Sequence, residues 1–304
     1  MALNDGRRQG TDLAQALGIS RAAVWKHIET LRTLGMDIEA DGKGYRLART
    51  IEWLDAEIIR AGLVKTDLVP QVLFLTESTN ACVKPENGLP QVILAEGQRA
   101  GRGRRGRGWV SPPGSGIYLS LGWRFEYGLT ALAPLGLVAG IAAGHALKRL
   151  GVDSIGLKWP NDLIAGGRKL GGCLIDINGT TDGPCDAVFG IGINVDLGTT
   201  MGIDQPWTDL HRLGARISRN ELAIELINSL IDHIEIFQRQ GFEALMTKWH
   251  EMDELAGRTV RVVRPAEAPL EGQADGIDEQ GRLRLLGEDG PVLVSSGEVS
   301  VRAV

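Results

Sequence analysis

Gly101-Arg102-Gly103-Arg104-Arg105-Gly106-Arg107-Gly108-Trp109 is the stretch that decides how this sequence is interpreted. It places four arginines and four glycines in eight residues before the tryptophan. Glycine lets the backbone approach a ligand closely, and arginine offers a rigid cationic fork for phosphate or carboxylate. Trp109 adds an apolar wall or a stacking face. The run departs from the Walker A pattern, and it predicts a mobile loop that binds an anion.

The setting of this run disfavours two simpler interpretations, a solvated Arg/Gly tail and an RNA-binding segment. We expect buried strands at 92–95 and 116–123, on either side of the run, so the run lies inside a folded domain. The chain of 304 residues carries a net charge of −5, which makes the basic patch a local feature. Its hydrophobic content of 43% is typical of a soluble protein with two or three domains.

Several classes of protein are disfavoured by composition. The three cysteines form no C-x-x-C pair and the five histidines are scattered, so neither a disulfide framework nor a zinc site is indicated. The first residues lack the pattern of a signal peptide, and the apolar stretch 132–147 is interrupted by Pro134 and is too short to span a bilayer. We therefore expect a cytoplasmic protein with no membrane partner.

Residues 1–50 predict a small helical module that resembles a winged helix-turn-helix. Thr11 or Asp12 is expected to cap a first helix ending at Leu17, and Ser20 to cap a second helix. The sequence 37–47 predicts a hairpin, or wing. Because few residues precede Asp12, we expect the usual preceding helix to be shortened or missing. The module is either a DNA-binding unit, with its second helix in the major groove, or a packing unit.

Residues 51–255 predict a larger α/β or α+β domain, and residues 256–304 predict a small all-β barrel. The expected buried strands of the larger domain are 72–75, 92–95, 116–123, 155–159, 169–176 and 187–195, and its expected helices are 132–150, 220–238 and 242–252. In the last domain, strands are expected at 259–263, 272–274, 283–286 and 292–294, with hairpin turns at 278–281 and 288–290.

Four further motifs accompany the Gly/Arg run. Lys158-Trp159-Pro160-Asn161-Asp162 is either a simple turn or a pair of groups for one anion, with Asp162 as a ligand for Mg²⁺. Lys169 opens a strand before two glycines, and it is either solvated or an inward cation. The alternating glycines of 190–194 indicate that something passes close to that strand. The motif 77–80 predicts a helix cap or a polar cluster.

In this order, the motifs 78–80, 95–107, 158–162, 168–172 and 190–194 resemble those of the biotin–protein ligases, and the whole chain is similar to their bifunctional bacterial form. That resemblance implies an α+β protein with three parts. They are a winged helix-turn-helix at 1–50, a mixed-sheet ligase domain like that of class II synthetases at 51–255, and an SH3-like barrel at 256–304. It also implies formation of biotinyl-5′-AMP from biotin and MgATP, then transfer of biotin to a lysine of a biotin carboxyl carrier protein.

The resemblance also implies roles for individual residues. Catalysis would fall to Lys169, Arg104, Arg105 and Arg107. Biotin would be bound by Ser78, Thr79, Asn80, Gln98, Arg102, Gly103, Arg104, Lys169, Gly171 and Gly190. ATP or the adenylate would contact Trp109, Lys158, Asn161, Asn194 and Trp207, and Asp162 would help to position Mg²⁺. DNA would be contacted by Ser20, Arg21, Trp25 and Lys26. The partners implied are the carrier protein, biotin operator DNA, and a second copy in an adenylate-bound homodimer.

Two alternatives stay open at this point. A lipoate or octanoate transferase shares the fold family, but the Gly/Arg run followed by the motif at 158–162 favours biotin. A regulator that binds biotin without catalysis is disfavoured by Lys169 and the full arginine set. Gly108 departs from the family pattern, where lysine often precedes the tryptophan, and one cation is lost there.

Overall fold

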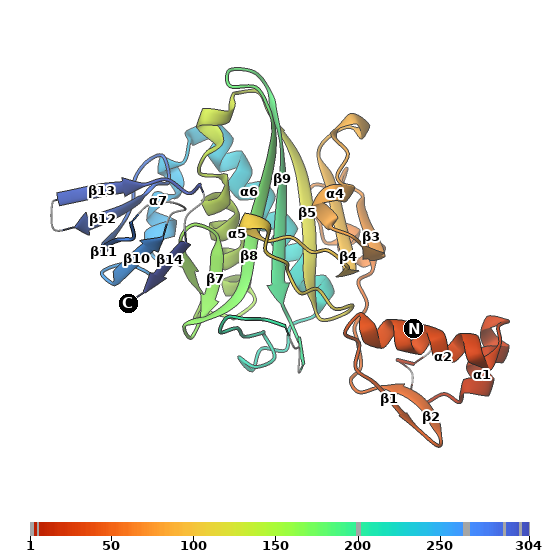
Figure 1. Ribbon diagram of the computed structural model, residues 1–304. Coiled ribbons are helices and arrows are strands. Elements are labelled where there is room, and N and C mark those ends of the chain that lie inside the picture. The colour runs from red at the N-terminus through yellow and green to blue at the C-terminus, as the bar shows by residue number, and fades with distance from the viewer. Residues whose placement is uncertain are drawn as a thin grey trace.

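The structure, a computed structural model, describes residues 3–4, 6–198, 202–263, 268–287, 290–297 and 300–303. A small helical module at the N-terminus protrudes from one end of a large mixed sheet, and a second, smaller sheet packs at the opposite side (Figure 1). The buried side chains of the N-terminal module form a core of their own, whereas those of the other two parts form one continuous core.

The N-terminal module contains helices α1 (Gly10–Leu17) and α2 (Arg21–Thr33) and the hairpin β1 (Ile38–Asp41) with β2 (Gly44–Leu47). Ser20 caps α2 as predicted, because its hydroxyl accepts from the Ala23 amide at 3.1 Å. The predicted cap of α1 is wrong: Gln9 is the N-cap, so Thr11 lies inside the first turn. Residues 3–4 and 6–9 contain no helix, and Arg8 instead pairs with Tyr45 beside the hairpin.

The central sheet has seven strands in the order β3-β4-β5-β9-β8-β7-β6. Their bounds are β3 Pro70–Thr76, β4 Gln91–Gln98, β5 Gly116–Phe125, β6 Gly156–Lys158, β7 Asp162–Ala165, β8 Arg168–Gly179 and β9 Cys185–Asn194. Only β3 and β4 run parallel, so the sheet is mixed, as predicted. The prediction of a fully buried strand at 72–75 is wrong, because β3 is an edge strand and Phe74 is half exposed. Strand β7 was not predicted.

Three helices, α5 (Leu135–Arg149), α6 (Arg219–Gln240) and α7 (Glu243–His250), cover one face of this sheet (Figure 1). The run Leu129–Arg149 is long and apolar enough to cross a membrane, but it is 67% buried inside the protein. It is therefore the core helix of a folded domain. The short helix α3 (Ala56–Ala61) was not predicted from the sequence, and α4 (Thr79–Cys82) begins at the possible cap in 77–80 and lies over β4, β5 and β9.

The C-terminal sheet is antiparallel, in the order β13-β12-β11-β10-β14. Its strands are β10 Thr259–Val263, β11 Leu270–Ile277, β12 Leu283–Gly287, β13 Gly290–Val294 and β14 Ser300–Ala303. The predicted turn at 278–281 is confirmed, since the Gly281 amide donates to the Asp278 carbonyl at 2.9 Å. The turn predicted at 288–290 falls partly outside the described residues. The buried Trp159 donates from Nε1 to the Gly281 carbonyl at 2.9 Å, which fixes this sheet to the central domain.

Candidate functional site

A cavity of about 560 Å³ lies over strands β4, β5, β8 and β9. Its walls come from the segments 78–80, 98–104 and 107–111, from the strand residues that face them, and from the loop after β9. Most of the predicted site residues line it: Ser78, Thr79, Asn80, Gln98, Arg102, Gly103, Arg104, Arg107, Trp109, Asn161, Asp162, Lys169, Gly190, Asn194 and Trp207. Arg105, Lys158 and Gly171 lie outside this lining.

One end of the cavity is a cluster of neutral polar groups. Thr79 donates from its backbone amide and its hydroxyl to Gln98 Oε1, at 2.9 and 3.2 Å. Asn80 Nδ2 donates to the Asp176 carboxylate at 3.0 Å. Both interpretations of this motif hold in part, because Ser78 is the N-cap residue of α4 without a side-chain capping bond, and residues 78–80 form the buried polar cluster. Such a set of amide and hydroxyl groups offers both donors and acceptors to a ligand.

Ser120 completes this cluster and was missed from the sequence. Its hydroxyl is fully buried and lies 2.8 Å from Thr79 Oγ1 and 2.6 Å from Asn80 Oδ1. The signal was a single serine in the apolar strand Gly116–Phe125, because a buried hydroxyl needs a hydrogen-bond partner. Asp176 was also missed, and its carboxylate, 42% exposed, accepts from Arg102 at 2.6 Å as well.

The alternating glycines of β9 make room for two side chains. A Cβ atom at Gly190 would collide with the side-chain amide of Asn80, and one at Gly192 would lie 2.7 Å from the indole of Trp109. The prediction that a group passes close to this strand is therefore confirmed. Both approaching groups are side chains of the cavity wall, so the glycines shape the cavity itself.

Charged groups gather at the other end of the cavity. Lys169 Nζ lies 2.7 Å from Asp162 Oδ1, and the lysine side chain is only 14% exposed. Of its two predicted positions, Lys169 therefore takes the inward one. The same ammonium lies 5.4 Å from the centre of the Trp109 ring. Behind them, burial raises the pKa of the Cys173 thiol to about 12, so that thiol stays protonated.

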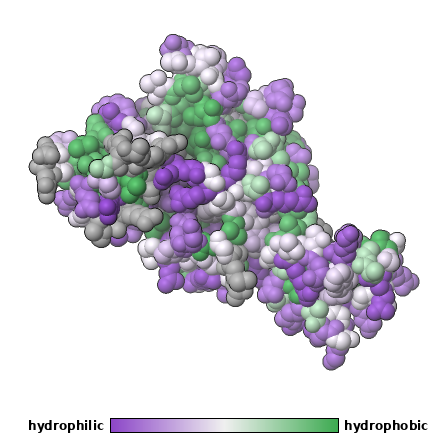
Figure 2. Space-filling view, in the orientation of Figure 1, coloured by the Kyte–Doolittle hydropathy of each residue, from purple (hydrophilic) through white to green (hydrophobic). Residues whose placement is uncertain are grey.

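The Gly/Arg loop crosses the face of the central sheet opposite α5 and α6 (Figure 1). Hydrophilic residues gather over the middle of that face, beside the C-terminal sheet (Figure 2). Arg104 donates to the Gly297 carbonyl at 2.6 Å and to the Ser296 carbonyl, both in the C-terminal domain. Burial lowers the pKa of Arg104, while the nearby Asp162 carboxylate raises it. Arg105 has a left-handed backbone, with φ of 60°, and turns out of the cavity lining.

A second contact of this loop is exposed. The Arg102–Asp176 pair has side chains 50% and 42% exposed, and such pairs contribute little stability. Exchanging this ion pair for a contact with a ligand therefore costs little free energy. Trp109 Nε1 is buried and has no hydrogen-bond partner among the described residues, so it is a donor open to a ligand.

The loop after β9 is tied to the backbone of Lys169. The Lys169 amide donates to the Pro206 carbonyl at 3.0 Å, and the Thr208 amide donates to the Lys169 carbonyl at 2.9 Å. Trp207, between them, packs its ring 3.8 Å from the Arg212 guanidinium carbon. Asn194, predicted to bond a ligand, donates from Nδ2 to the Thr208 carbonyl at 2.9 Å. Asn161 also contacts the backbone, because its Nδ2 donates to the Cys173 carbonyl of β8 at 2.6 Å.

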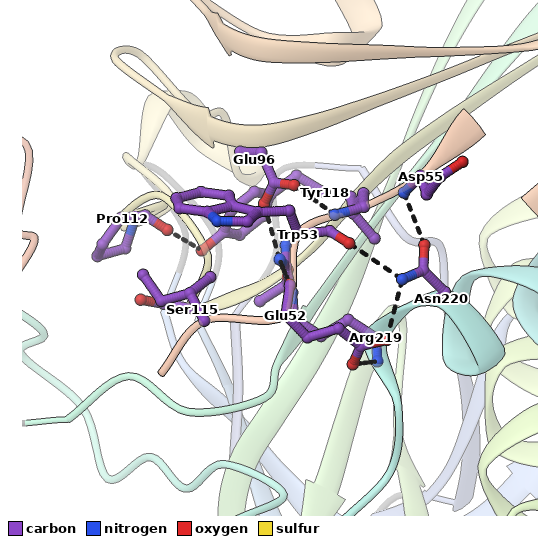
Figure 3. A network of polar contacts seen from close by, with 12 residues as sticks. Glu52, Trp53, Asp55, Glu96, Pro112, Ser115, Tyr118, Arg219 and Asn220 are labelled. Carbon is purple, nitrogen blue, oxygen red and sulfur yellow. Dashed lines mark hydrogen bonds and ion pairs between the residues drawn. The ribbon is translucent and has the colours of Figure 1, made fainter. Parts of the chain in front are cut away.

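A buried network connects this site to the segment that follows the N-terminal module (Figure 3). Arg219 and Glu96 form an ion pair of 2.7 Å with both side chains 4% exposed. Arg219 also donates to the Glu52 carbonyl at 2.7 Å, and Glu96 accepts from the Leu54 amide at 2.5 Å. Asn220 bonds both Trp53 and Asp55. The linker is thus fixed to the strand that carries Gln98, and sequence patterns gave no sign of this network.

The predicted DNA contacts lie on the N-terminal module, away from the cavity. Arg21, Trp25 and Lys26 are exposed on α2, whose buried residues are Val24 and Ile28. Ser20 is exposed at the start of that helix. All four residues are accessible to a partner, and Arg21 and Trp25 line one hollow of the module.

Comparison with known proteins agrees with this arrangement along the whole chain. Residues 75–194 match the biotin/lipoate A/B protein ligase family. Residues 2–46 match an HTH domain, and residues 256–302 match the biotin protein ligase C terminal domain.

Individual relatives span almost the full length. The chain is 39% identical to the bifunctional ligase/repressor BirA of Salmonella typhimurium, over 99% of this chain and 95% of that protein. It is 36% identical to the biotin–[acetyl-CoA-carboxylase] ligase of Mycobacterium tuberculosis, over 68% of this chain and 77% of that protein. Among solved structures, the biotin protein ligase from Aquifex aeolicus in complex with biotin and ATP has a TM-score of 0.67 at 27% identity, covering 77% of this chain and 99% of that one.

Proposed function

This chain belongs to the biotin protein ligase family, and we propose that its cavity carries out both steps of an ATP-dependent, AMP-forming biotin–[acetyl-CoA-carboxylase] ligase. One observation carries the proposal. A single cavity joins a neutral cluster of amide and hydroxyl groups, around Thr79 and Gln98, to a cationic end formed by Lys169, Arg104 and Arg107. Biotin has the matching character, with a neutral ureido ring at one end and a carboxylate at the other.

In the first step, a biotin carboxylate oxygen attacks the α-phosphorus of ATP. The new oxygen–phosphorus bond replaces the bond to the bridging oxygen, and pyrophosphate leaves. Two anions repel each other as they approach, so the site has to supply cations where charge accumulates. Lys169 is the candidate for the carboxylate and the α-phosphate, and Arg104, Arg105 and Arg107 are candidates for the remaining phosphates. Arg105 would have to turn inward to act there.

Thr79, Asn80 and Gln98 are the candidates for the ureido ring, together with Ser78, Gly190 and the backbone of 102–104. The close approach of Asn80 to Gly190 supports this assignment, because it fixes the amide at the cavity wall. Gly171, behind the wall, would act by leaving space for the Gly192 carbonyl. Trp109, Asn161, Asn194 and Trp207 are the candidates around the nucleotide, and Lys158 supports them from outside the lining.

Asp162 is the candidate for Mg²⁺ coordination. The described residues contain no cluster of three metal-ligating side chains. The single carboxylate of Asp162 still fits Mg²⁺, because this ion is commonly held by one or two carboxylates together with substrate phosphates and water. When bound, the ion would neutralise phosphate charge. In the structure the Asp162 carboxylate is paired with Lys169. When substrate binds, Lys169 would leave this carboxylate and contact the substrate anions instead.

In the second step, a lysine amine of a biotin carboxyl carrier protein attacks the carbonyl carbon of the mixed anhydride. The carbon–oxygen bond to phosphate breaks, the amine loses a proton, and AMP leaves. The adenylate must meanwhile be protected from water. Closure of 101–109, with Trp109 over the ligand, would provide that protection.

The remaining proposals concern the whole chain. We propose that its three domains span residues 1–50, 51–255 and 256–304. We also propose that residues 1–50 give the protein a second role as a biotin-responsive repressor. Its surface residues Ser20, Arg21, Trp25 and Lys26 are the candidates for operator contact. The chain is expected to act in the cytoplasm and to form a homodimer when it holds the adenylate.

The test is a biotinylation assay with a purified biotin carboxyl carrier domain, ATP and Mg²⁺. Mass spectrometry should detect one added biotinyl group, and a carrier with its acceptor lysine replaced by arginine should stay unmodified. Parallel reactions with lipoate distinguish the related transferases, because lipoyl transfer without biotinyl transfer would refute the proposal. Retention of biotin without release of pyrophosphate would instead indicate a regulator with no catalytic activity.

A further inference from the structure

Trp25 is a large apolar side chain that is exposed to solvent beside the hairpin. Its side chain is 59% exposed, and every other tryptophan among the described residues is more buried. The inner face of α2 packs Val24 and Ile28 into the small core of the module, at 3% exposure each. Trp25 therefore plays no part in that core. An exposed indole of this size is typical of a surface that receives a partner.

The surroundings of Trp25 form a hollow of about 760 Å³ between α2 and the hairpin. Arg21 and Ala22 line it from the helix, Lys43 and Tyr45 from the hairpin. Arg21 lies one turn before Trp25, so the two side chains share a helix face. The other end of α2 approaches the central domain, where Gly35 lies beside Pro112. Trp25 belongs to the N-terminal half of α2, which is the half farther from the central domain (Figure 1).

Charge indicates the class of partner. Residues 1–50 contain eight Lys or Arg and six Asp or Glu, whereas the rest of the chain contains 25 and 32. The module is therefore positive on a protein that is negative as a whole. Arg21 and Lys26, on either side of Trp25 in sequence, make no ion pair with any residue that the structure describes. The surface of the module is mostly hydrophilic (Figure 2). These features favour a polyanion over an apolar protein surface.

Within the major groove of DNA, the edges of the bases carry hydrogen-bonding groups and one apolar group, the methyl of thymine. Contacts from arginine and lysine to phosphate give affinity but carry no sequence information. We propose that Trp25 reads a thymine methyl group in the major groove, and that it is a specificity-determining residue of this module. The proposal rests on the proposed repressor function, and it names the chemical group on the DNA that this chain distinguishes.

The test begins with a duplex selected from a random DNA library by the full-length protein with biotin and ATP. Fluorescence anisotropy then compares that duplex with versions in which one thymine at a time is replaced by deoxyuridine, which removes only the methyl group. For the unmodified protein, one replacement should weaken binding about fourfold, the value expected for one buried carbon. For Trp25→Ala, the same replacement should have no effect. Trp25→Phe, which keeps an apolar ring, should retain part of the sensitivity.

Lys26→Ala is the matched control. It should weaken binding to every duplex by the same factor while the sensitivity to deoxyuridine persists, because a phosphate contact is independent of sequence. If Trp25→Ala still binds DNA and retains the full penalty for deoxyuridine, the readout is refuted and DNA binding stands. If the unmodified protein selects no duplex, the repressor function itself is refuted, and the inference falls with it. A change of oligomeric state in Trp25→Ala without DNA would identify the face as a protein interface and would also overturn the proposal.

Discussion

Lys169 Nζ lies 2.7 Å from Asp162 Oδ1, and both side chains line the cavity that Trp109 partly covers. The carboxylate holds the lysine at the point where we propose that the two substrate anions meet. This pairing predicts that Lys169→Ala removes the main inward cation of the first step. Its rate of pyrophosphate release with biotin and ATP should fall at least about 100-fold, the scale of losing one electrostatic contact to a transition state. Lys84→Ala, which removes an exposed lysine elsewhere, should leave the rate unchanged.

The identity of the step that fails separates a catalytic role of Lys169 from a structural one. If Lys169→Ala binds biotin normally but forms no adenylate, the assigned role is supported. If it forms adenylate at the normal rate, Lys169 serves only to neutralise Asp162, and the assignment is wrong. Thermal unfolding of both variants excludes a difference in folding.

A second prediction follows from the two glycines of β9. A methyl group at Gly190 would displace the amide of Asn80, so Gly190→Ala should raise KM for biotin by about tenfold while KM for ATP changes little. A methyl group at Gly192 would push on the Trp109 indole, so Gly192→Ala should act on retention of the adenylate. Gly108→Ala is the control, because its surroundings are open and a methyl group there meets nothing within 4 Å. Equal effects of all three changes on KM for biotin would contradict this assignment.

These glycines also show what sequence patterns identify. Alternating glycines in an apolar strand predict that something passes close to the backbone, and the structure confirms that expectation. The pattern does not specify what passes, since Asn80 lies over 100 residues before Gly190 in the chain. The Gly/Arg run shows the same limit of prediction from sequence. Its loop character follows from composition, but the partners of Arg102 and Arg104 are 74 and 193 residues away and depend on the packing of the central and C-terminal domains.

Residues that were missed had either a weak local signal or none. Ser120 stands alone among apolar neighbours in its strand, which is a signal for a buried hydrogen bond. Arg219 looks like an ordinary residue at the start of a surface helix. Its burial follows only from Glu96, 123 residues earlier, whose strand lies under that helix terminus. Edge strands were misjudged for a similar reason, because the apolar run that forms β3 does not reveal that one side lacks a neighbour.

The pair Glu96–Arg219 gives a third prediction, on stability. Both side chains are 4% exposed, so removal of one partner leaves an uncompensated charge in the interior. Glu96→Ala should lower the free energy of unfolding by about 3–5 kcal/mol. Glu96→Gln, which keeps an acceptor for the Leu54 amide, should lower it by less. The control is Glu271→Ala, which breaks an exposed pair with Arg261 and should change the free energy by less than about 1 kcal/mol. Urea denaturation measures all three, and equal losses for Glu96→Ala and Glu271→Ala would contradict the prediction.

A fourth prediction concerns two histidines packed between α5 and α6. His145 Nδ1 and His233 Nε2 lie 3.1 Å apart, and Lys248 Nζ lies 3.5 Å from His233 Nε2. Burial, together with the charges of His233, Lys248, Lys148 and Arg149, lowers the pKa of His145 to about 4. Burial also lowers the pKa of His233.

In the unfolded chain both histidines titrate near their ordinary pKa of about 6.5. Below that pH the unfolded state takes up protons that the folded state does not, so the free energy of unfolding should fall as the pH drops from about 6.5 to about 4. The loss from His145 should be on the order of 2 kcal/mol, allowing for its partial exposure. His145→Gln should flatten this part of the profile, whereas His27→Gln, at an exposed position, should leave its slope unchanged. An unaltered slope in His145→Gln would show that His145 does not contribute to the response to acid.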